Sequence, residues 1–147
     1  MRIIFLDIDG VMNCLEEQDG EYIHDVLVSK LKTLKSLVNS TNSSIVLSSD
    51  RRTLKSEIER IKEGFDMFSI PFEGITRFPN RRLGYDCKGL QILDYIKERN
   101  DIDSFVIFDD NDEGISSYCP SSFILINGVY GLREDDCKKA EKILLRQ

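Results

Sequence analysis

Carboxylates and hydroxyls directly follow several apolar, strand-like runs of this sequence. Three pairs do so: Asp7 and Asp9 after RIIFL, Ser48 and Ser49 after SIVL, and Asp109 and Asp110 after SFVIF. The β-branched and aromatic content of each run is typical of a buried strand. Open α/β sheets bind ligands in the crevice outside the carboxyl ends of their strands. We therefore expect these side chains to meet at one edge of a sheet.

A dense group of carboxylates in such a crevice requires a counter-ion, because like charges repel and burial disfavours the charged form. Oxygen ligands favour a hard cation, and Mg²⁺ is usually held by a few carboxylates with water and phosphate. A lone aspartate at a strand end is more often a turn former, so the prediction depends on the strand ends taken together. The strand ends together predict a magnesium site formed by Asp7, Asp9, Asp109 and Asp110.

Basic side chains lie near these strand ends in the sequence. Lys88 falls in the first turn of an expected helix, where the helix dipole disfavours a cation. Its ammonium is either solvated, or reaches into the acidic crevice to hold a phosphate. Five arginines are also candidates for contact with phosphates: Arg51, Arg52, Arg77, Arg81 and Arg82. They form either a solvated surface or a path for a polynucleotide, along which Phe78 and Tyr85 could stack on bases.

The positions of apolar residues predict an α/β fold with a doubly wound, Rossmann-like, mostly parallel sheet and helices on both faces. Strands are expected at residues 2–8, 44–49, 72–76, 104–108 and 122–126, and helices at residues 25–39, 53–64, 88–99 and 134–146. Gly64 suits the left-handed position that ends a helix. His24 is expected to be a cap or surface residue.

Length and composition place further limits on the protein. With 147 residues and 41% hydrophobic content, we expect a single domain over residues 1–147, a monomer by default. It has neither a leader pattern nor an apolar run of the ~20 residues that span a bilayer, so we expect a soluble, cytoplasmic protein without a membrane partner. A net charge of −6 argues against an indiscriminate nucleic-acid coat but leaves room for a local basic groove. The scattered cysteines predict reduced thiols.

The order of these motifs resembles that of the haloacid dehalogenase-like (HAD) superfamily of magnesium-dependent phosphohydrolases. FLDIDGV, the serine closing IVLS, the lysine of KGL and IFDD are similar to its four motifs. The resemblance implies that Asp7 is the nucleophile, which takes the phosphoryl group as an acyl phosphate, and that Asp9 is the general acid and base. It also implies that Ser48 and Lys88 bind the phosphoryl group.

The resemblance extends to the metal and to neighbouring phosphate ligands. It implies that Asp110 is the direct metal ligand of the acidic pair, with Asp109 beside it, and that Asp9 contributes its backbone carbonyl. Ser49 and Arg51 follow the second motif, and we expect them to contribute to substrate phosphate binding.

A finer resemblance is to HAD domains associated with RNA repair proteins, through IVLSSDRR, KGLQILDYI and VIFDDNDEG. A tryptophan commonly precedes the arginine after the second motif in that branch, whereas Asp50 stands here. Residues 11–24 have room only for a hairpin flap, so we expect no cap domain. An open crevice favours an accessible phosphate, such as the 3′ or 5′ end of RNA or DNA, over an enclosed metabolite.

Other functions remain open on the sequence alone. Within the same chemistry, the substrate could be a small phosphoester or a phosphoprotein. A phosphoacceptor module of the receiver type also has an acidic pocket, a hydroxyl and a lysine, although its motifs come in another order. A catalytically silent phosphate-binding HAD domain is the third possibility.

Overall fold

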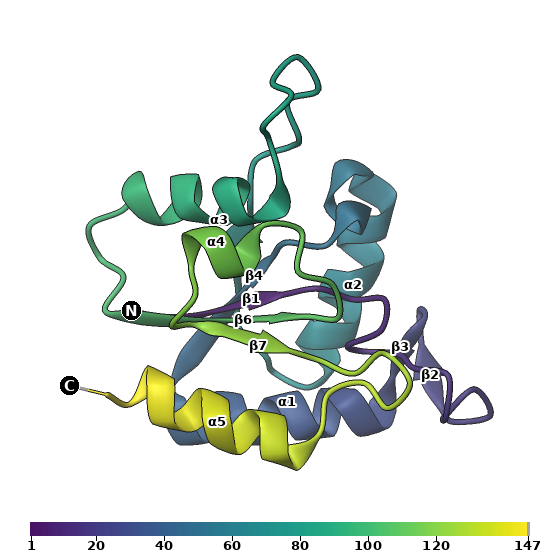
Figure 1. The fold of residues 1–147 in the computed structure, drawn as a ribbon. Coiled ribbons are helices and arrows are strands. Elements are labelled where there is room, and N and C mark those ends of the chain that lie inside the picture. Colours follow the sequence, from purple (N-terminus) through teal and green to yellow (C-terminus); the bar gives the residue numbers. More distant parts are fainter. Residues whose placement is uncertain (147) are drawn as a thin grey trace.

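Five parallel strands form the central sheet in the computed structural model, which describes residues 1–146. The strands are β1 (Arg2–Leu6), β4 (Ser43–Leu47), β5 (Phe72–Ile75), β6 (Ser104–Asp109) and β7 (Phe123–Leu125). They lie in the order β5-β4-β1-β6-β7, and every neighbouring pair is parallel (Figure 1). The chain builds outward from β1 on one side and then crosses to the other. The predicted doubly wound α/β class is therefore confirmed.

Helices cover both faces of this sheet (Figure 1). One face carries α1 (Val28–Thr41), α2 (Lys55–Met67) and α5 (Glu134–Leu144), and the other carries α3 (Lys88–Lys97) and α4 (Ile115–Tyr118). Because side chains alternate along a strand, Ile4 and Leu6 pack in the first apolar cluster and Ile3 and Phe5 in the second. Within residues 1–146, no helix has the length and apolar character needed to cross a membrane.

A short hairpin lies between β1 and the first helix. It consists of β2 (Tyr22–Ile23) and β3 (Val26–Leu27), joined by His24 and Asp25, which both have positive φ angles. Two such residues are what a tight hairpin turn with primed geometry requires. The helix predicted to begin at residue 25 therefore begins only at Val28, and His24 is a turn residue rather than a cap. No cap domain is present in the described residues.

The prediction that Gly64 ends a helix is wrong. A short 3₁₀ helix, η1 (Asp50–Thr53), comes first, and α2 then continues past Gly64 to Met67. Phe65 is fully buried, so one further turn of helix places an apolar side chain in the core. The helix α4 has no counterpart among the predicted elements, because four residues are too few to reveal a helical period.

Candidate active site

The register of the sheet aligns three polar residues at its carboxyl edge. Leu6, which ends β1, pairs with Leu47 on one side and with Phe108 on the other. The residues that follow them form one row across three strands: Asp7, Ser48 and Asp109. The backbone ladder continues into this row, since the Asp7 N–H donates to the Phe108 carbonyl at 3.0 Å. The structure thus brings together the strand ends that the sequence singled out.

Strand alternation directs this row toward the start of α3. The residues two positions earlier belong to the apolar cluster beneath α3 and α4: Phe5, Val46 and Ile107. With a side-chain period of two, the row points to the same face of the sheet. Lys88 is the first residue of α3 and lies on this face.

Lys88 is buried within a group of carboxylates. Its Nζ donates to Asp109 Oδ2 at 2.8 Å and lies 3.1 Å from Glu113 Oε2 and 3.6 Å from Asp7 Oδ1. Burial lowers the pKa of Lys88, but the Asp7 and Asp109 carboxylates outweigh that effect and raise the pKa overall. The ammonium is therefore charged and fixed at the site, and the solvated alternative for this lysine does not hold.

Asp7, Asp109 and Asp110 form an aspartate cluster in which one oxygen of each lies within 4.8 Å of the others. Burial raises the pKa of Asp7 to about 8, and Lys88 offsets this only in part. Burial likewise raises the pKa of Asp109 against the effect of Lys88. Lys88 alone therefore supplies too little positive charge to keep these carboxylates fully ionised, and the ligand atoms of the site are all oxygen. Both properties suit a hard divalent cation.

The two aspartates of the acidic pair differ in their surroundings. Asp109 is fully buried and accepts from Lys88 Nζ and from the Asn111 N–H at 3.0 Å. Asp110 is exposed, and its carboxylate lies against Gly10, where an added Cβ would be 2.1 Å from Asp110 Oδ2. Gly10 also has a φ of +82°, which a side chain rarely adopts. Asp110 is therefore the member of the pair with a carboxylate accessible to a metal ion.

The Ser48 hydroxyl is fully buried and has no hydrogen-bond partner within residues 1–146. An unpaired buried hydroxyl costs about 1–3 kcal/mol, and an oxygen of a bound ligand could accept a hydrogen bond from it. The Thr76 hydroxyl is buried and unpaired in the same way. Ser49 differs, because its hydroxyl accepts from the Arg51 N–H at 3.2 Å at the start of η1. Of the two serines, Ser48 is thus the one available to a phosphate.

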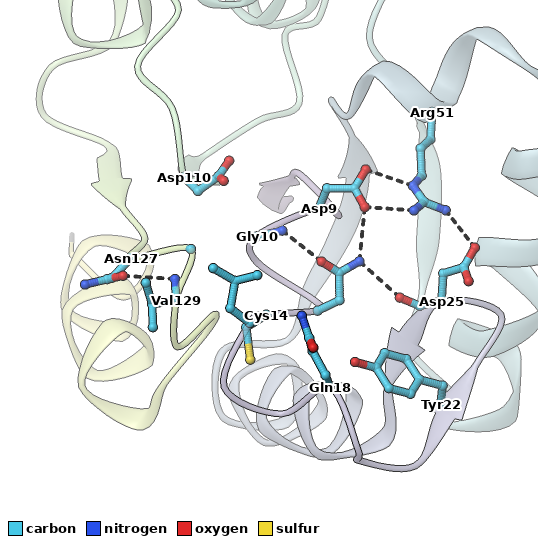
Figure 2. A pocket seen from close by; sticks show the side chains of 13 residues that line it. Asp9, Gly10, Cys14, Gln18, Tyr22, Asp25, Arg51, Asp110, Asn127 and Val129 are labelled. Carbon is cyan, nitrogen blue, oxygen red and sulfur yellow. Dashed lines mark hydrogen bonds and ion pairs between the residues drawn. The ribbon is translucent and has the colours of Figure 1, made fainter.

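Asp9 points toward Arg51 and away from Asp110 (Figure 2). Arg51 donates to both Asp9 oxygens, at 2.7 and 3.0 Å, and Asn13 Nδ2 adds a hydrogen bond at 3.1 Å. Arg51 in turn lies 3.2 Å from both Asp25 and Glu57, which fix it between the hairpin and α2. The hydrogen bonds from Arg51 hold the pKa of Asp9 below its usual value. Asp9 is thus a carboxylate here, and Arg51 is fully engaged.

A pocket of about 650 Å³ opens beside the site (Figure 2). Asp9 and Arg51 line one side of the pocket, Asp110 and Asn127 line the opposite side, and Tyr22 of the hairpin lines it below Arg51 in this view. This volume is within the range of small-molecule sites. The pocket can therefore receive the group that carries a phosphate held at the aspartate cluster.

The prediction that Arg52 contacts a polymer is wrong, because Arg52 is fully buried. Its guanidinium donates to four backbone carbonyls and to one side-chain amide: those of Ser48, Ser49, Thr76, Arg77 and Gln91. These hydrogen bonds join the ends of β4 and β5 to α3. Arg52 therefore supports the site from beneath and has no face toward solvent.

The remaining arginines fall into two groups. Arg77 is paired with Asp86 at 2.8 Å and with Asp94 at 2.9 Å, which makes it a support for the loop before α3. Arg81 and Arg82 are exposed, and their side chains make no ion pair or hydrogen bond within the described residues. These two remain available to a partner.

Two residues that the sequence did not single out contribute to the site. Glu113 adds a third carboxylate beside Lys88, and Asn13 holds both the Gly10 N–H and the Asp9 carboxylate. Each stands within the turn after a motif aspartate, which is the available sequence signal. Without the structure, neither can be distinguished from an ordinary turn residue.

The order of the strands in the sheet tests the receiver-type alternative. Numbered along the chain, the sheet strands lie in the order third, second, first, fourth, fifth. Receiver-type proteins share the other common doubly wound order, in which the second strand is at the edge and the first lies between the second and the third. The receiver alternative is therefore wrong.

Comparison with known proteins finds a matching family. The family model described as "HAD domain in Swiss Army Knife RNA repair proteins" matches residues 3–137. No curated protein and no solved structure matches the chain. Apart from Arg2, the first residue of β1, the matched range contains every strand of the central sheet and all of the site residues described above. It confirms the resemblance that the motifs indicated.

Proposed function

We propose that this chain, which belongs to the family of HAD domains in Swiss Army Knife RNA repair proteins, is a magnesium-dependent phosphomonoesterase that forms an aspartyl phosphate on Asp7. The family supports a HAD-type phosphohydrolase in general. The single observation that carries the finer proposal is the row at the carboxyl edge. Within this row, the buried Asp7 carboxylate stands beside the unpaired hydroxyl of Ser48, and both face the buried ammonium of Lys88 from α3.

Asp7 and Asp110 would hold the metal ion, with Asp109 buried beside them and, by the family resemblance, the backbone carbonyl of Asp9. The shortage of positive charge beside the aspartate cluster and its oxygen-only ligands support this assignment. When bound, Mg²⁺ would neutralise charge on the phosphoryl oxygens and orient them.

The reaction would proceed as two displacements at phosphorus. An Asp7 oxygen attacks phosphorus and the bond to the leaving oxygen breaks. Asp9, which has taken up a proton from solvent after leaving Arg51, donates that proton to the leaving oxygen. Water then attacks the phosphorus and gives a proton to Asp9, which releases inorganic phosphate and restores the Asp7 carboxylate. The Ser48 hydroxyl and the Lys88 ammonium hold the phosphoryl oxygens in both steps.

Arg51 would connect substrate binding to the acid role of Asp9. The bidentate pair holds Asp9 as a carboxylate, so Asp9 must leave Arg51 before it can donate a proton. A substrate phosphate competes for the same planar guanidinium donors. Arg51 thus serves as a phosphate ligand whose engagement releases Asp9.

The proposed substrate is an accessible phosphate, such as the 3′ or 5′ end of RNA or DNA. The open pocket beside Asp9 and Asp110 and the lack of a cap within residues 1–146 support a large leaving group. The family description supports RNA among the polymers. Small phosphoesters and phosphoproteins are the alternatives that the substrate comparison below decides.

The test is phosphate release from an aryl phosphate and from 3′- and 5′-phosphorylated oligonucleotides, with Mg²⁺ and with EDTA. Wild type is expected to turn over only with Mg²⁺, and Asp7→Asn to lose activity on every substrate. Asp19→Asn, a change at an exposed carboxylate of the flap, is the matched control and should retain wild-type rates. Folded wild-type protein that releases no phosphate from any substrate would instead favour the silent binding domain.

A further inference from the structure

The loop between β5 and α3 projects from the body of the molecule (Figure 1). Its two limbs are tied at the base, where Arg77 donates to both Asp86 oxygens, at 2.8 and 3.1 Å, and to Asp94 of α3 at 2.9 Å. Asp86 also accepts from the Asn80 N–H at 2.7 Å. These hydrogen bonds span both limbs, so the tip is carried on a braced stem.

The tip, residues 78–85, displays aromatic and cationic side chains to solvent. Phe78 is 52% exposed and Tyr85 is 67% exposed. Arg81 and Arg82 are exposed without any side-chain partner in residues 1–146. Large apolar side chains and unpaired cations on one projecting loop are unusual in a chain with a net charge of −6. Such a surface is a candidate for a binding role.

The chemistry of the tip fits single-stranded nucleic acid. Unpaired bases stack on exposed aromatic rings, and arginines pair with the phosphates that link those bases. An acidic peptide would satisfy the two arginines but offers no flat groups for the two rings. The aromatic side chains therefore favour a nucleic acid over an acidic protein.

The loop leads directly to the proposed phosphate site. Tyr85 precedes Lys88 by three residues, and an extended chain of that length spans at most about 10–11 Å. The Lys88 ammonium pairs with Asp7 and Asp109. A strand held on the tip would thus have one end close to the aspartate cluster.

We propose that residues 78–85 bind the single-stranded segment next to a phosphorylated end, with Phe78 and Tyr85 stacking on bases and Arg81 and Arg82 pairing with backbone phosphates. This inference deepens the proposed function and rests on it for the identity of the end. The binding itself is measurable without any turnover.

The experiment is fluorescence anisotropy of a labelled, unphosphorylated single-stranded RNA oligonucleotide added to the full chain. Loss of one stacking ring should weaken binding by about tenfold, given the usual contribution of base stacking, so Tyr85→Ala and Phe78→Ala should each show this loss. Tyr85→Trp should retain affinity and Tyr85→Leu should not, since a leucine is apolar but cannot stack.

The electrostatic part is tested by salt dependence. Each ion pair with a phosphate of a single strand adds about 0.7 to the slope of log affinity against log salt. The double variant Arg81→Ala/Arg82→Ala removes two such pairs and should therefore reduce the slope by about 1.4. Arg146→Ala is the matched control, because Arg146 is exposed and also makes no side-chain pair within the described residues. It should leave the slope unchanged.

The outcomes separate this inference from the proposed function. Tip variants that bind RNA within about twofold of wild type would overturn the inference, as would wild-type protein that hydrolyses an aryl phosphate but binds no RNA. The second result would direct attention to an acidic protein partner. RNA binding that depends on the tip, in a protein that releases phosphate from no substrate, would support the inference and overturn the phosphatase. Urea unfolding of each variant checks that these exposed changes leave the fold intact.

Discussion

Replacing Arg52 by methionine should destabilise the protein by about 3–5 kcal/mol, because several buried acceptors would lose their hydrogen-bond donor. Arg52 is fully buried, and its donors satisfy carbonyls at the ends of β4 and β5. Methionine has a flexible apolar side chain that can occupy much of the same space. The change therefore removes hydrogen bonds with little loss of packing.

The magnitude follows from two opposing contributions. Each hydrogen bond from a charged donor contributes about 1.5–3 kcal/mol, and four carbonyls and the Gln91 side chain accept from Arg52. Against this, burial disfavours the guanidinium, as the lowered pKa of Arg52 shows. Removing that penalty offsets part of the loss. The net change is still a large fraction of a total stability of about 5–15 kcal/mol.

Urea unfolding followed by circular dichroism measures this difference. Arg81→Met is the matched control and should stay within about 0.5 kcal/mol of wild type, as exposed substitutions usually do. Arg52→Lys keeps the charge but has fewer donors, so its free energy of unfolding should lie between those of Arg52→Met and Arg81→Met. It also keeps the prediction measurable if Arg52→Met does not fold. Equal stability of Arg52→Met and Arg81→Met would refute the structural role of Arg52. Arg52 would then again be a candidate for contact with a polymer.

Three further predictions concern charge and metal. The Arg77 hydrogen bonds lower the pKa of Asp86 from 3.8, so the stability advantage of wild type over Asp86→Asn should be full at pH 7 and shrink as the pH falls below about 4; urea unfolding at pH 7 and at about pH 3 checks this. Mg²⁺ at about 100 times its Kd should stabilise wild type by about 2.7 kcal/mol, which thermal unfolding with and without Mg²⁺ measures. Asp110→Asn should lose most of this stabilisation. Gly10→Ala should also lose the stabilisation by Mg²⁺, because the new Cβ would displace the Asp110 carboxylate. A Gly10→Ala protein that Mg²⁺ stabilises as much as it stabilises wild type would contradict this prediction.

The row of Asp7, Ser48 and Asp109 is predictable from the sequence, because each stands directly after an unbroken apolar run. The two-residue period of strands and the parallel register then bring the three together. The engagement of Asp9 with Arg51 is not predictable in this way. It depends on how the segment after β4 packs against the hairpin, and no local pattern encodes that pairing.

Sequence patterns do not predict which of the arginine side chains are buried. Arg51 and Arg52 are neighbours in one polar stretch, yet one faces Asp9 at the pocket and the other is buried. A 3₁₀ turn at η1 decides which of them points inward, and its period cannot be recognised in so short a segment. In contrast, Arg81 and Arg82 lie on the surface, as the sequence predicts, and no acidic side chain within the described residues pairs with them.

The most direct test of the proposed chemistry is to quench the wild-type protein with acid during turnover of an oligonucleotide phosphate and to locate covalent phosphate by peptide mass spectrometry. A nucleophilic Asp7 predicts a phosphoryl group on the peptide that contains this residue, and none in Asp7→Asn protein. Phosphate found on Asp109 or Asp110 instead, or full phosphate release by Asp7→Asn, would contradict it.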